Sequence, residues 1–471
     1  MEILNNKIEI TADLQQALSS ELAWHYRIVP KEKKDNTFSF YIDENANLAV
    51  TKEELEVITG FEIQLVPCVT LQVQQALGTY FRQIKSKENA ELKLSHDTDF
   101  VDRIIQEANS LGSSDIHIEV YEDKGRVRIR IDGHLIERYK IPLENYSELV
   151  NKIKIHANLD ISEKRLPQDG RIQYGDFDIR VSILPTLHGE KIVLRILGHD
   201  ASSISIDSVG MSEKELRDYM EGIKKPNGII LISGPTGSGK TTTLYATLKL
   251  LNEEKRNIVT VEDPIEYTLE GINQVQLKED IGLTFTAALR SFLRQDPDVI
   301  MLGEIRDGET AQMAIRAALT GHLVLSTIHT NSAWGTISRL IDMGVPPFLL
   351  SNTINCSVAQ RLVRKLCPSC KILSPINSAD LPLQYDKQKA PQEHYVAVGC
   401  ESCHYTGYKG RQAIYEIIPI DQELSNCIKE QNMRVEELLL TRNIKSIGER
   451  ADELWKKGIT TLEEVYPFLL D

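Results

Sequence analysis

The sequence lacks an apolar run long enough to cross a membrane, and its first residues lack the basic and then apolar layout of a secretory signal. A membrane span needs roughly 20 consecutive apolar residues. The hydrophobic residues here, 41% of 471, are interrupted by charge well before that length. We therefore expect a cytoplasmic protein whose contact with a membrane runs only through partners.

An excess of positive charge is also absent, because 54 Lys and Arg face 68 Asp and Glu, for a formal net charge of -14. Proteins that bind nucleic acid broadly usually carry a basic surface, so this balance argues against a nucleic-acid partner. Internal repeats and low-complexity tracts are missing as well. A chain of this length exceeds what one core can organise, and about three domains are expected.

One stretch, residues 228–243, combines an apolar run of strand length, a glycine-dense turn and leucines at helical spacing. The turn matches G-x-x-x-x-G-K-[ST], in which backbone N–H groups surround phosphate oxygens. Lys240 would reach the β- and γ-phosphates, and the Thr241 hydroxyl would bind Mg²⁺. A glycine-rich turn that binds nothing is the alternative. The predicted nucleotide-binding residues are Gly234, Pro235, Thr236, Gly237, Ser238, Gly239, Lys240, Thr241 and Thr242.

Acidic residues follow two further strand-like runs. Glu262 and Asp263 come after residues 258–261, and Glu304 comes after residues 299–302. In a parallel sheet with a phosphate loop, the ends of these strands face the nucleotide. Carboxylates there can hold Mg²⁺ through water or orient the attacking water. Acids that only cap helices or line loops are the alternative.

Histidines and arginines supply further candidates. An apolar strand separates His322 from His329, and a neutral imidazole can sense or polarise a γ-phosphate, although a core or surface role is as common. Arg290 and Arg294 share one face of a predicted helix over residues 285–294. An arginine can stabilise transition-state charge within its own chain or across a subunit boundary, and the sequence leaves that choice open.

Two C-x-x-C pairs separated by 29 residues form the second clear motif. Four thiolates can close a tetrahedron around Zn²⁺, and such a site has no open position, so we predict a structural zinc site. Redox pairs are the alternative in a cytosolic chain. His404 directly follows the last cysteine and is expected to be a bystander. The predicted zinc ligands are Cys367, Cys370, Cys400 and Cys403.

The organisation predicted from these patterns is an α/β multidomain protein. Strand-like and helical runs alternate around the phosphate loop, which predicts a parallel sheet covered by helices. The predicted segments are an α/β N-terminal domain (1–80), a polar linker (81–97), an α+β domain (98–202), the phosphate-loop domain (203–365), a tetracysteine element (366–405) and a helical C-terminus (406–471).

Four blocks together resemble the GspE/PilB branch of the secretion-ATPase superfamily. Residues 234–243, 260–267, 296–307 and 319–331 are similar to its Walker A motif, Asp box, Walker B motif and His box. Residues 114–119 and 167–171 are similar to motifs of its N2 domain, and residues 360–367 lead into the tetracysteine element typical of this branch. The resemblance covers nearly the whole chain.

The resemblance implies a homo-hexameric ring of RecA-like P-loop ATPase domains on the cytoplasmic side of a bacterial inner membrane. Residues 1–80 would be an E-type docking domain for the cytoplasmic domain of a membrane protein, and residues 98–202 a PAS-like N2 domain. ATP hydrolysis would act on an inner-membrane platform and drive pilin or pseudopilin assembly in a type II secretion or type IV pilus machine. Glu262 and Glu304 would share Mg²⁺ coordination and water activation, His322 and His329 would lie near the γ-phosphate, and the arginines that close the site would come from Arg171, Arg180, Arg290 and Arg294.

Two other functions remain as alternatives. A RecA-like nucleic-acid translocase predicts DNA-stimulated ATPase activity and a basic stripe, and the charge of -14 argues against it. A scaffold that binds ATP without turnover would not need Lys240, Glu262 and Glu304 together. The choice between type II secretion and pilus assembly stays open.

Overall fold

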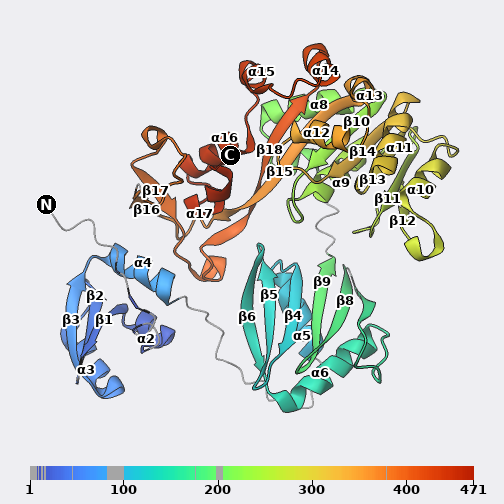
Figure 1. Ribbon diagram of the computed structural model, residues 1–471. Coiled ribbons are helices and arrows are strands. Elements are labelled where there is room, and N and C mark those ends of the chain that lie inside the picture. The colour runs from blue at the N-terminus through green and yellow to red at the C-terminus, as the bar shows by residue number, and fades with distance from the viewer. Residues whose placement is uncertain are drawn as a thin grey trace.

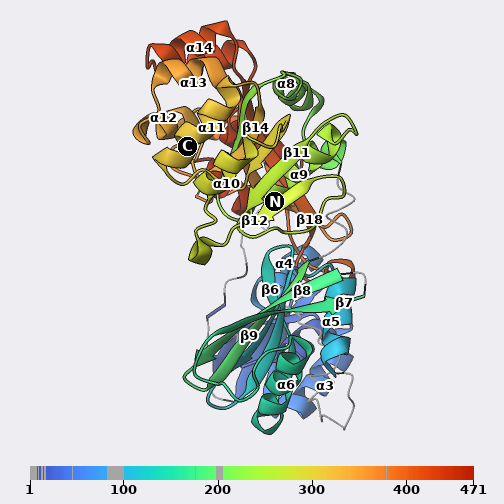
Figure 2. The same ribbon diagram turned by 90° about the vertical axis from the view of Figure 1, so that its right-hand side faces the viewer.

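A computed structural model describes residues 8, 10–11, 14, 17–34, 36–44, 46–81, 100–175, 177–197, 205–377 and 379–470. These residues form three bodies, with the largest above the second in Figures 1 and 2. Nearly all of the linker predicted at 81–97 lies outside the described residues. None of the helices within the described ranges has the length and apolarity that a membrane span requires.

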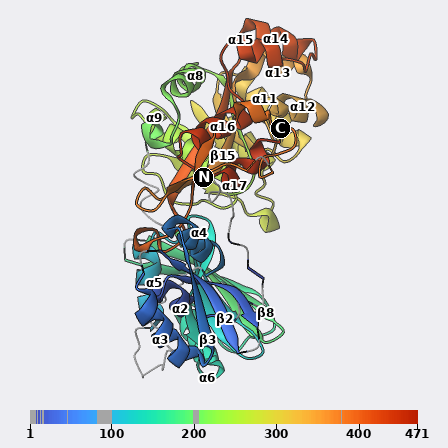
Figure 3. The same cartoon turned by 90° about the vertical axis from the view of Figure 1, so that its left-hand side faces the viewer.

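The first domain is a three-stranded sheet packed against helices, and Figure 3 faces it. Phe38, Phe40 and Ile42 alternate into its core, as the period of two predicts. Of the helix predicted at 11–20, residues 12, 13, 15 and 16 lie outside the described residues, and the prediction is wrong for 17–19, which are not helical and precede the start of α2 at Ser20. The elements are α2 (Ser20–His25), β1 (Ile28–Lys34), β2 (Thr37–Asp43), α3 (Leu48–Thr59), β3 (Glu62–Cys68) and α4 (Thr70–Tyr80).

The second domain is an antiparallel six-stranded sheet of order β6-β5-β4-β9-β8-β7, with α5 and α6 packed on one face. The predicted amphipathic helix is present, and its apolar stripe of Phe100, Ile104, Ile105 and Ala108 is buried. The elements are α5 (Phe100–Ser110), β4 (Asp115–Val120), β5 (Gly125–Ile131), β6 (His134–Ile141), α6 (Leu143–His156), β7 (Gln168–Tyr174), β8 (Phe177–Thr186) and β9 (Gly189–Leu197).

The third domain is built on a seven-stranded sheet of order β12-β11-β13-β14-β10-β15-β18. Its neighbouring strands are parallel except for the pair β15 and β18, as the alternation of strands and helices predicts. Its strands are β10 (Gly228–Ser233), β11 (Ile258–Glu262), β12 (Asn273–Gln276), β13 (Val299–Leu302), β14 (Leu323–Ile328), β15 (Ile354–Leu366) and β18 (Tyr408–Pro419).

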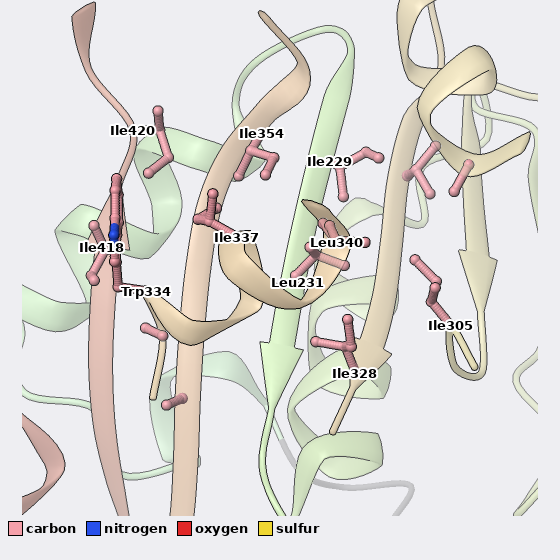
Figure 4. Close-up of a cluster of buried hydrophobic side chains, with 14 of the residues drawn as sticks. Ile229, Leu231, Ile305, Ile328, Trp334, Ile337, Leu340, Ile354, Ile418 and Ile420 are labelled. Carbon is pink, nitrogen blue, oxygen red and sulfur yellow. The ribbon is translucent and has the colours of Figure 1, made fainter. Parts of the chain in front are cut away.

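Helices bury both faces of this sheet, because successive residues of each strand point to opposite sides. Ile230 and Ile232 face the cluster formed with α8 and α9, whereas Ile229 and Leu231 face the cluster of Figure 4, which includes Ile337 and Leu340 of α12. The helices are α8 (Glu213–Ile223), α9 (Lys240–Leu251), α10 (Phe285–Phe292), α11 (Gly308–Leu319), α12 (Gly335–Asp342) and α13 (Pro347–Thr353).

The C-terminal segment corrects one prediction. A helical region was expected over 406–471, but residues 408–419 form β18, the edge strand of the main sheet. The reason is period-two burial, because Ile414 and Ile418 enter one core cluster while Tyr415 and Ile417 enter the other. The phosphate-loop domain therefore extends beyond 365. The helices that follow pack on its core: α14 (Gln422–Lys429), α15 (Glu436–Thr441), α16 (Ile447–Lys456) and α17 (Leu462–Val465).

Between β15 and β18 the chain forms an arm that carries the four cysteines (Figure 1). Where β18 begins, the Gly410 N–H donates to Asp132 Oδ2 of the second domain at 2.8 Å. The small elements of the arm are β16 (Ile372–Pro375), η3 (Lys387–Lys389), β17 (Glu393–Val396) and η4 (Glu401–Cys403). Three further short helices are η1 (Ile206–Ser208), η2 (Glu279–Ile281) and η5 (Tyr466–Phe468).

Replacing Trp455 by Ala tests whether the C-terminal helices share the main core. The indole is 0% exposed within the cluster that covers the sheet. The loss of such a side chain is expected to destabilise the domain by about 3–5 kcal/mol. In urea, amide hydrogen exchange of Trp455→Ala should show the C-terminal helices and the seven-stranded sheet losing protection together, at lower urea than in the wild-type protein. The control, Leu470→Ala, removes a side chain that is 45% exposed. C-terminal helices that lose protection separately from the sheet would contradict the shared core.

Candidate functional site

The phosphate-loop motif occupies the turn between β10 and α9. Gly234, Gly237 and Gly239 adopt φ values of 149°, 81° and 87°, a region that favours glycine. A Cβ on Gly234 would lie 2.4 Å from the Gln360 carbonyl oxygen, so the loop runs too close to β15 for a side chain. This glycine-rich loop leads directly into the N-terminus of α9, and a loop followed by a helix N-terminus is an arrangement that binds phosphate in proteins.

The side chains of the motif lie where binding would need them. The Lys240 ammonium donates to the carbonyl oxygens of Gly234 at 2.8 Å and Pro235 at 3.1 Å, so it lies inside the loop. Burial lowers the pKa of Lys240, while Glu304 opposes that shift. Thr241 is exposed on the first turn of α9, and Thr242 is half-buried. The nine predicted nucleotide-binding residues thus run from the end of β10 into the first turn of α9, with residues 235–237 and Thr241 exposed and Gly234 and Ser238 buried. Their ligand stays a prediction.

Glu304 lies at the same edge of the sheet, two residues beyond the end of β13. Its carboxylate accepts a hydrogen bond from Arg306 Nη2 at 2.6 Å and lies 3.3 Å from His329 Nε2. Burial acts to raise the pKa of Glu304, but Arg306 and His329 hold it below its usual range. β13, β14 and β10 are parallel neighbours, so Glu304, His329 and the phosphate loop meet at one edge.

Glu262 is held differently. It ends β11, is 3% exposed, and accepts hydrogen bonds from the Tyr245 hydroxyl, from Thr260 Oγ1 at 2.6 Å and from Gln274 Nε2 at 3.1 Å. Burial, and then the Glu262 charge, raise the pKa of Tyr245. Neutral donors therefore fix the Glu262 carboxylate, whereas charged groups surround that of Glu304. The sequence places both acids at strand ends but does not reveal this difference.

The two candidate histidines lie at opposite ends of β14. His322 precedes β14, and the register pairs Gly228 with Leu323 and Ser233 with Ile328. His322 therefore lies at the amino edge of the sheet, about 20 Å along the strand from the phosphate-loop edge. Its Nδ1 lies 2.8 Å from the Ala317 carbonyl oxygen. The expectation that His322 lies near the γ-phosphate is therefore wrong within one chain. His322 precedes β14 and His329 follows it, so the two histidines lie at opposite edges of the sheet.

The four candidate arginines have different neighbours. Arg180 on β8 donates to the Ile265 carbonyl and lies 3.8 Å from Glu266 Oε2, so it joins the second domain to the loop after Glu262. Arg171 is the register partner of Arg180 on β7 and pairs with Asp178. Arg290 on α10 lies 3.1 Å from Glu309 Oε1, and Arg294, in the turn two residues after α10 ends, donates to the Arg290 carbonyl oxygen at 2.7 Å. Their roles stay predictions.

The four cysteines come together at the base of the arm. All four Sγ atoms lie within 4.8 Å of one another, and three of the pairs are 3.8 Å apart. Zinc bound to four thiolates at roughly 2.3 Å requires sulfur separations of about 3.8 Å. The Gly407 and Cys400 N–H groups donate to Cys403 Sγ. The cluster therefore fits a tetrahedral metal ion, and His404 beside it is exposed.

Three residues around the phosphate loop were not identified as site candidates from the sequence. Arg306 bridges Glu304 and, at 3.5 Å, Asp263. Gln360 and Arg361 lie on β15 beneath the loop, where Thr243 Oγ1 donates to Gln360 Oε1 at 3.0 Å. For Gln360 and Arg361 the signal was a polar pair between the apolar residues 358–359 and 362–363, which does not reveal what that pair contacts.

Comparisons with known proteins agree on one family. The model of the family described as "Type II/IV secretion system protein" matches residues 92–467. The type II secretion system protein E of Pseudomonas aeruginosa is 48% identical over 373 residues, covering 78% of this chain and 74% of that protein. The type IV pilus assembly ATPase PilB of Myxococcus xanthus is 39% identical over 495 aligned positions, covering 97% of this chain and 87% of that protein.

Solved structures show the same architecture. The pilus retraction motor PilT with bound ADP is 28% identical, with a TM-score of 0.55 over 78% of this chain and 96% of that chain. The ATPase DotB of Legionella pneumophila, 22% identical, has a TM-score of 0.58 over 79% of this chain and 95% of that chain, and supports the fold alone. The chain therefore belongs to the type II/IV secretion system protein family and is one of its ATPases.

Proposed function

We propose that this chain hydrolyses ATP at the carboxyl edge of its RecA-like seven-stranded sheet and thereby powers the assembly of pilin or pseudopilin subunits. The observation that carries the proposal is the meeting of Lys240, Glu304 and His329 at that edge beside a phosphate loop. The relatives named for type II secretion and type IV pilus assembly support the machine class.

The phosphate loop holds the phosphates of ATP. Backbone N–H groups of residues 236–242 would donate to the phosphate oxygens. The Lys240 ammonium, which here donates to the Gly234 and Pro235 carbonyl oxygens, would bind the β- and γ-phosphates instead. Thr241 is the exposed hydroxyl on the first turn of α9 and fits a Mg²⁺ ligand. When bound, Mg²⁺ neutralises charge on the β- and γ-phosphate oxygens.

The two glutamates divide the remaining work. Glu304 stays ionised at neutral pH, because Arg306 and His329 stabilise its charge, and it orients the attacking water. His329 faces the γ-phosphate from the end of β14. Glu262 contributes to the Mg²⁺ shell through water with a carboxylate that three neutral donors hold in place.

The arginines act when domains and subunits close. Arg180 already contacts the loop after Glu262, which supports a role for Arg180 and its neighbour Arg171 within the same chain. Arg290 on α10 and Arg294 just after it are both exposed, which supports a role for them at the site of a neighbouring subunit in a homo-hexameric ring. Closure of the N2-type second domain over ATP then transmits the rearrangement.

The remaining parts connect the motor to its machine. The first domain docks on the cytoplasmic domain of a membrane protein, and the ring acts on an inner-membrane platform at the cytoplasmic face of the membrane. Its contact with the membrane runs through these partners, and nucleic acid is not among them. The cysteine cluster holds a structural Zn²⁺ that closes the arm between β15 and β18. Lys371 Nζ donates to the Gly458 carbonyl oxygen at 2.8 Å and docks that arm on the C-terminal helices.

Replacing Glu304 by Gln tests the chemistry. Glu304→Gln should keep ATP binding and lower phosphate release by about 10²–10⁴-fold, the usual effect of losing a general base. Lys240→Ala should lose nucleotide binding itself. A fluorescent ATP analogue measures binding and a phosphate sensor measures turnover, with the exposed Glu253→Gln as the matched control. Turnover by Glu304→Gln at the wild-type rate would remove Glu304 from the catalytic residues.

Replacing Cys370 by Ser tests the zinc site. Elemental analysis should find one zinc per wild-type chain and much less in Cys370→Ser. The arm should become sensitive to protease, because structural zinc sites contribute folding energy directly. Cys427→Ser, in α14, is the matched control. Unchanged zinc in Cys370→Ser would rule out the four-cysteine site.

A further inference from the structure

The segment that follows His329 is bonded at both ends by buried ionisable side chains. Arg361 Nη2 donates to the Asn331 carbonyl oxygen at 2.7 Å, and Glu416 Oε1 accepts a hydrogen bond from the Ala333 N–H at 3.3 Å. Arg361 is 8% exposed and Glu416 is 6% exposed. A cation and a carboxylate thus hold the two ends of residues 331–333.

Two further bonds tie this segment to the strands beneath it. The Ser233 hydroxyl at the end of β10 donates to the Ser332 carbonyl oxygen at 3.4 Å, and the Ser357 hydroxyl of β15 donates to the Ala333 carbonyl oxygen at 2.6 Å. Burying charged and polar groups is costly unless they are well bonded. Here the Arg361 guanidinium and the Glu416 carboxyl group both bond to loop backbone, which favours one position of the segment.

Arg361 also lies beneath the phosphate loop. Its Nη1 donates to the Gln360 carbonyl oxygen at 3.0 Å and would lie 3.1 Å from a Cβ on Gly234. Its charge adds to the burial that lowers the pKa of Lys240. One guanidinium therefore bonds to the segment after His329 and lies close to Gly234 of the phosphate loop, so it is next to the two loops on either side of the proposed γ-phosphate position.

Glu416 extends the connection to the C-terminus. Burial raises the pKa of Glu416 to about 7, while the N–H groups of Ala333 and Ile447 and the charge of Arg361 act to lower it. Ile447 is the first residue of α16. Glu416 lies on β18, where it is the register partner of Ala359 on β15. Arg361 lies on β15 as well, so Glu416 and Arg361 are on adjacent strands.

We propose that Arg361 and Glu416 are positioning residues for hydrolysis, which fix residues 331–333 and so hold His329 against Glu304 at a set distance from the phosphate loop. The inference rests on the proposed hydrolysis at this site. ADP needs only the phosphate loop, whereas the γ-phosphate of ATP lies between the two loops. Loss of either side chain therefore affects the γ-phosphate step more than ADP binding.

The test separates turnover from binding. In Arg361→Gln and Glu416→Leu, kcat should fall about 10²-fold, the effect of roughly 1 Å of misplacement, with the ADP dissociation constant changed less than about threefold. Arg361→Lys should be as impaired as Arg361→Gln, because an ammonium cannot span two carbonyls as the planar fork does. Glu416→Gln keeps an acceptor for the Ala333 N–H and should restore kcat to near the wild-type value.

Arg364→Gln is the matched control. Arg364 lies on the same strand, pairs with Glu464 at 2.6 Å and stacks on Tyr408. Its loss should lower the urea midpoint and leave kcat of the folded protein unchanged. Urea midpoints of all variants identify any that fail to fold. If Arg361→Gln or Glu416→Leu fails to fold, the kcat values of Arg361→Lys and Glu416→Gln are compared with that of Arg364→Gln instead. The inference is wrong if the Arg361 and Glu416 variants match Arg364→Gln in kcat, or lose ADP binding in parallel with kcat.

Measuring Glu304→Gln in the same assay shows whether a negative result contradicts the positioning role or the proposed hydrolytic site. If Glu304→Gln retains wild-type turnover, the proposed site itself is wrong. If Glu304→Gln stops turnover and the Arg361 and Glu416 variants match the control, only the positioning role is wrong.

Discussion

The architecture of the site depends on the close approach of the phosphate-loop backbone to β15. A Cβ on Gly234 would lie 2.4 Å from the Gln360 carbonyl oxygen, so this contact admits only glycine. The contact fixes β15 beside β10, and β14 pairs with the other side of β10. Arg361 then lies under the loop while His329 ends the neighbouring strand. The loop, Glu304 and His329 thus lie at one edge of the sheet, because β10, β13 and β14 are parallel neighbours and each residue follows the carboxyl end of its strand.

Strand direction decides at which edge of the sheet each functional residue lies, and only part of that placement could be predicted from the sequence. The phosphate loop, Glu304 and His329 were predictable, because their motifs end apolar runs and parallel strands share an edge. The location of His322 was predicted wrongly, since a motif does not say at which edge each end of a strand lies. Arg306 and Arg361 could not be identified as site residues, because their contacts join segments distant in the chain. The strand at 408–419 was read as part of a helical region for a similar reason, since its alternating burial depends on two core clusters from other elements.

Three connections join the site to the rest of the molecule. Arg180 links the second domain to the loop after Glu262, and the Gly410 N–H links that domain to the start of β18. Glu416 contacts the segment after His329 and the first residue of α16. The cysteine arm is continuous with β15 and β18, the strands that carry Arg361 and Glu416. A change at the γ-phosphate position therefore has direct routes to the second domain, the arm and the C-terminal helices, as a motor requires.

The central claim is that this chain is an assembly-activated secretion ATPase. The most direct measurement is the rate of ATP hydrolysis per chain as a function of protein concentration, with and without single-stranded DNA. The account predicts a rate per chain that rises with concentration as subunits complete one another's sites, and that DNA leaves unchanged. A rate per chain that is independent of concentration and rises with DNA would contradict it and favour a nucleic-acid translocase.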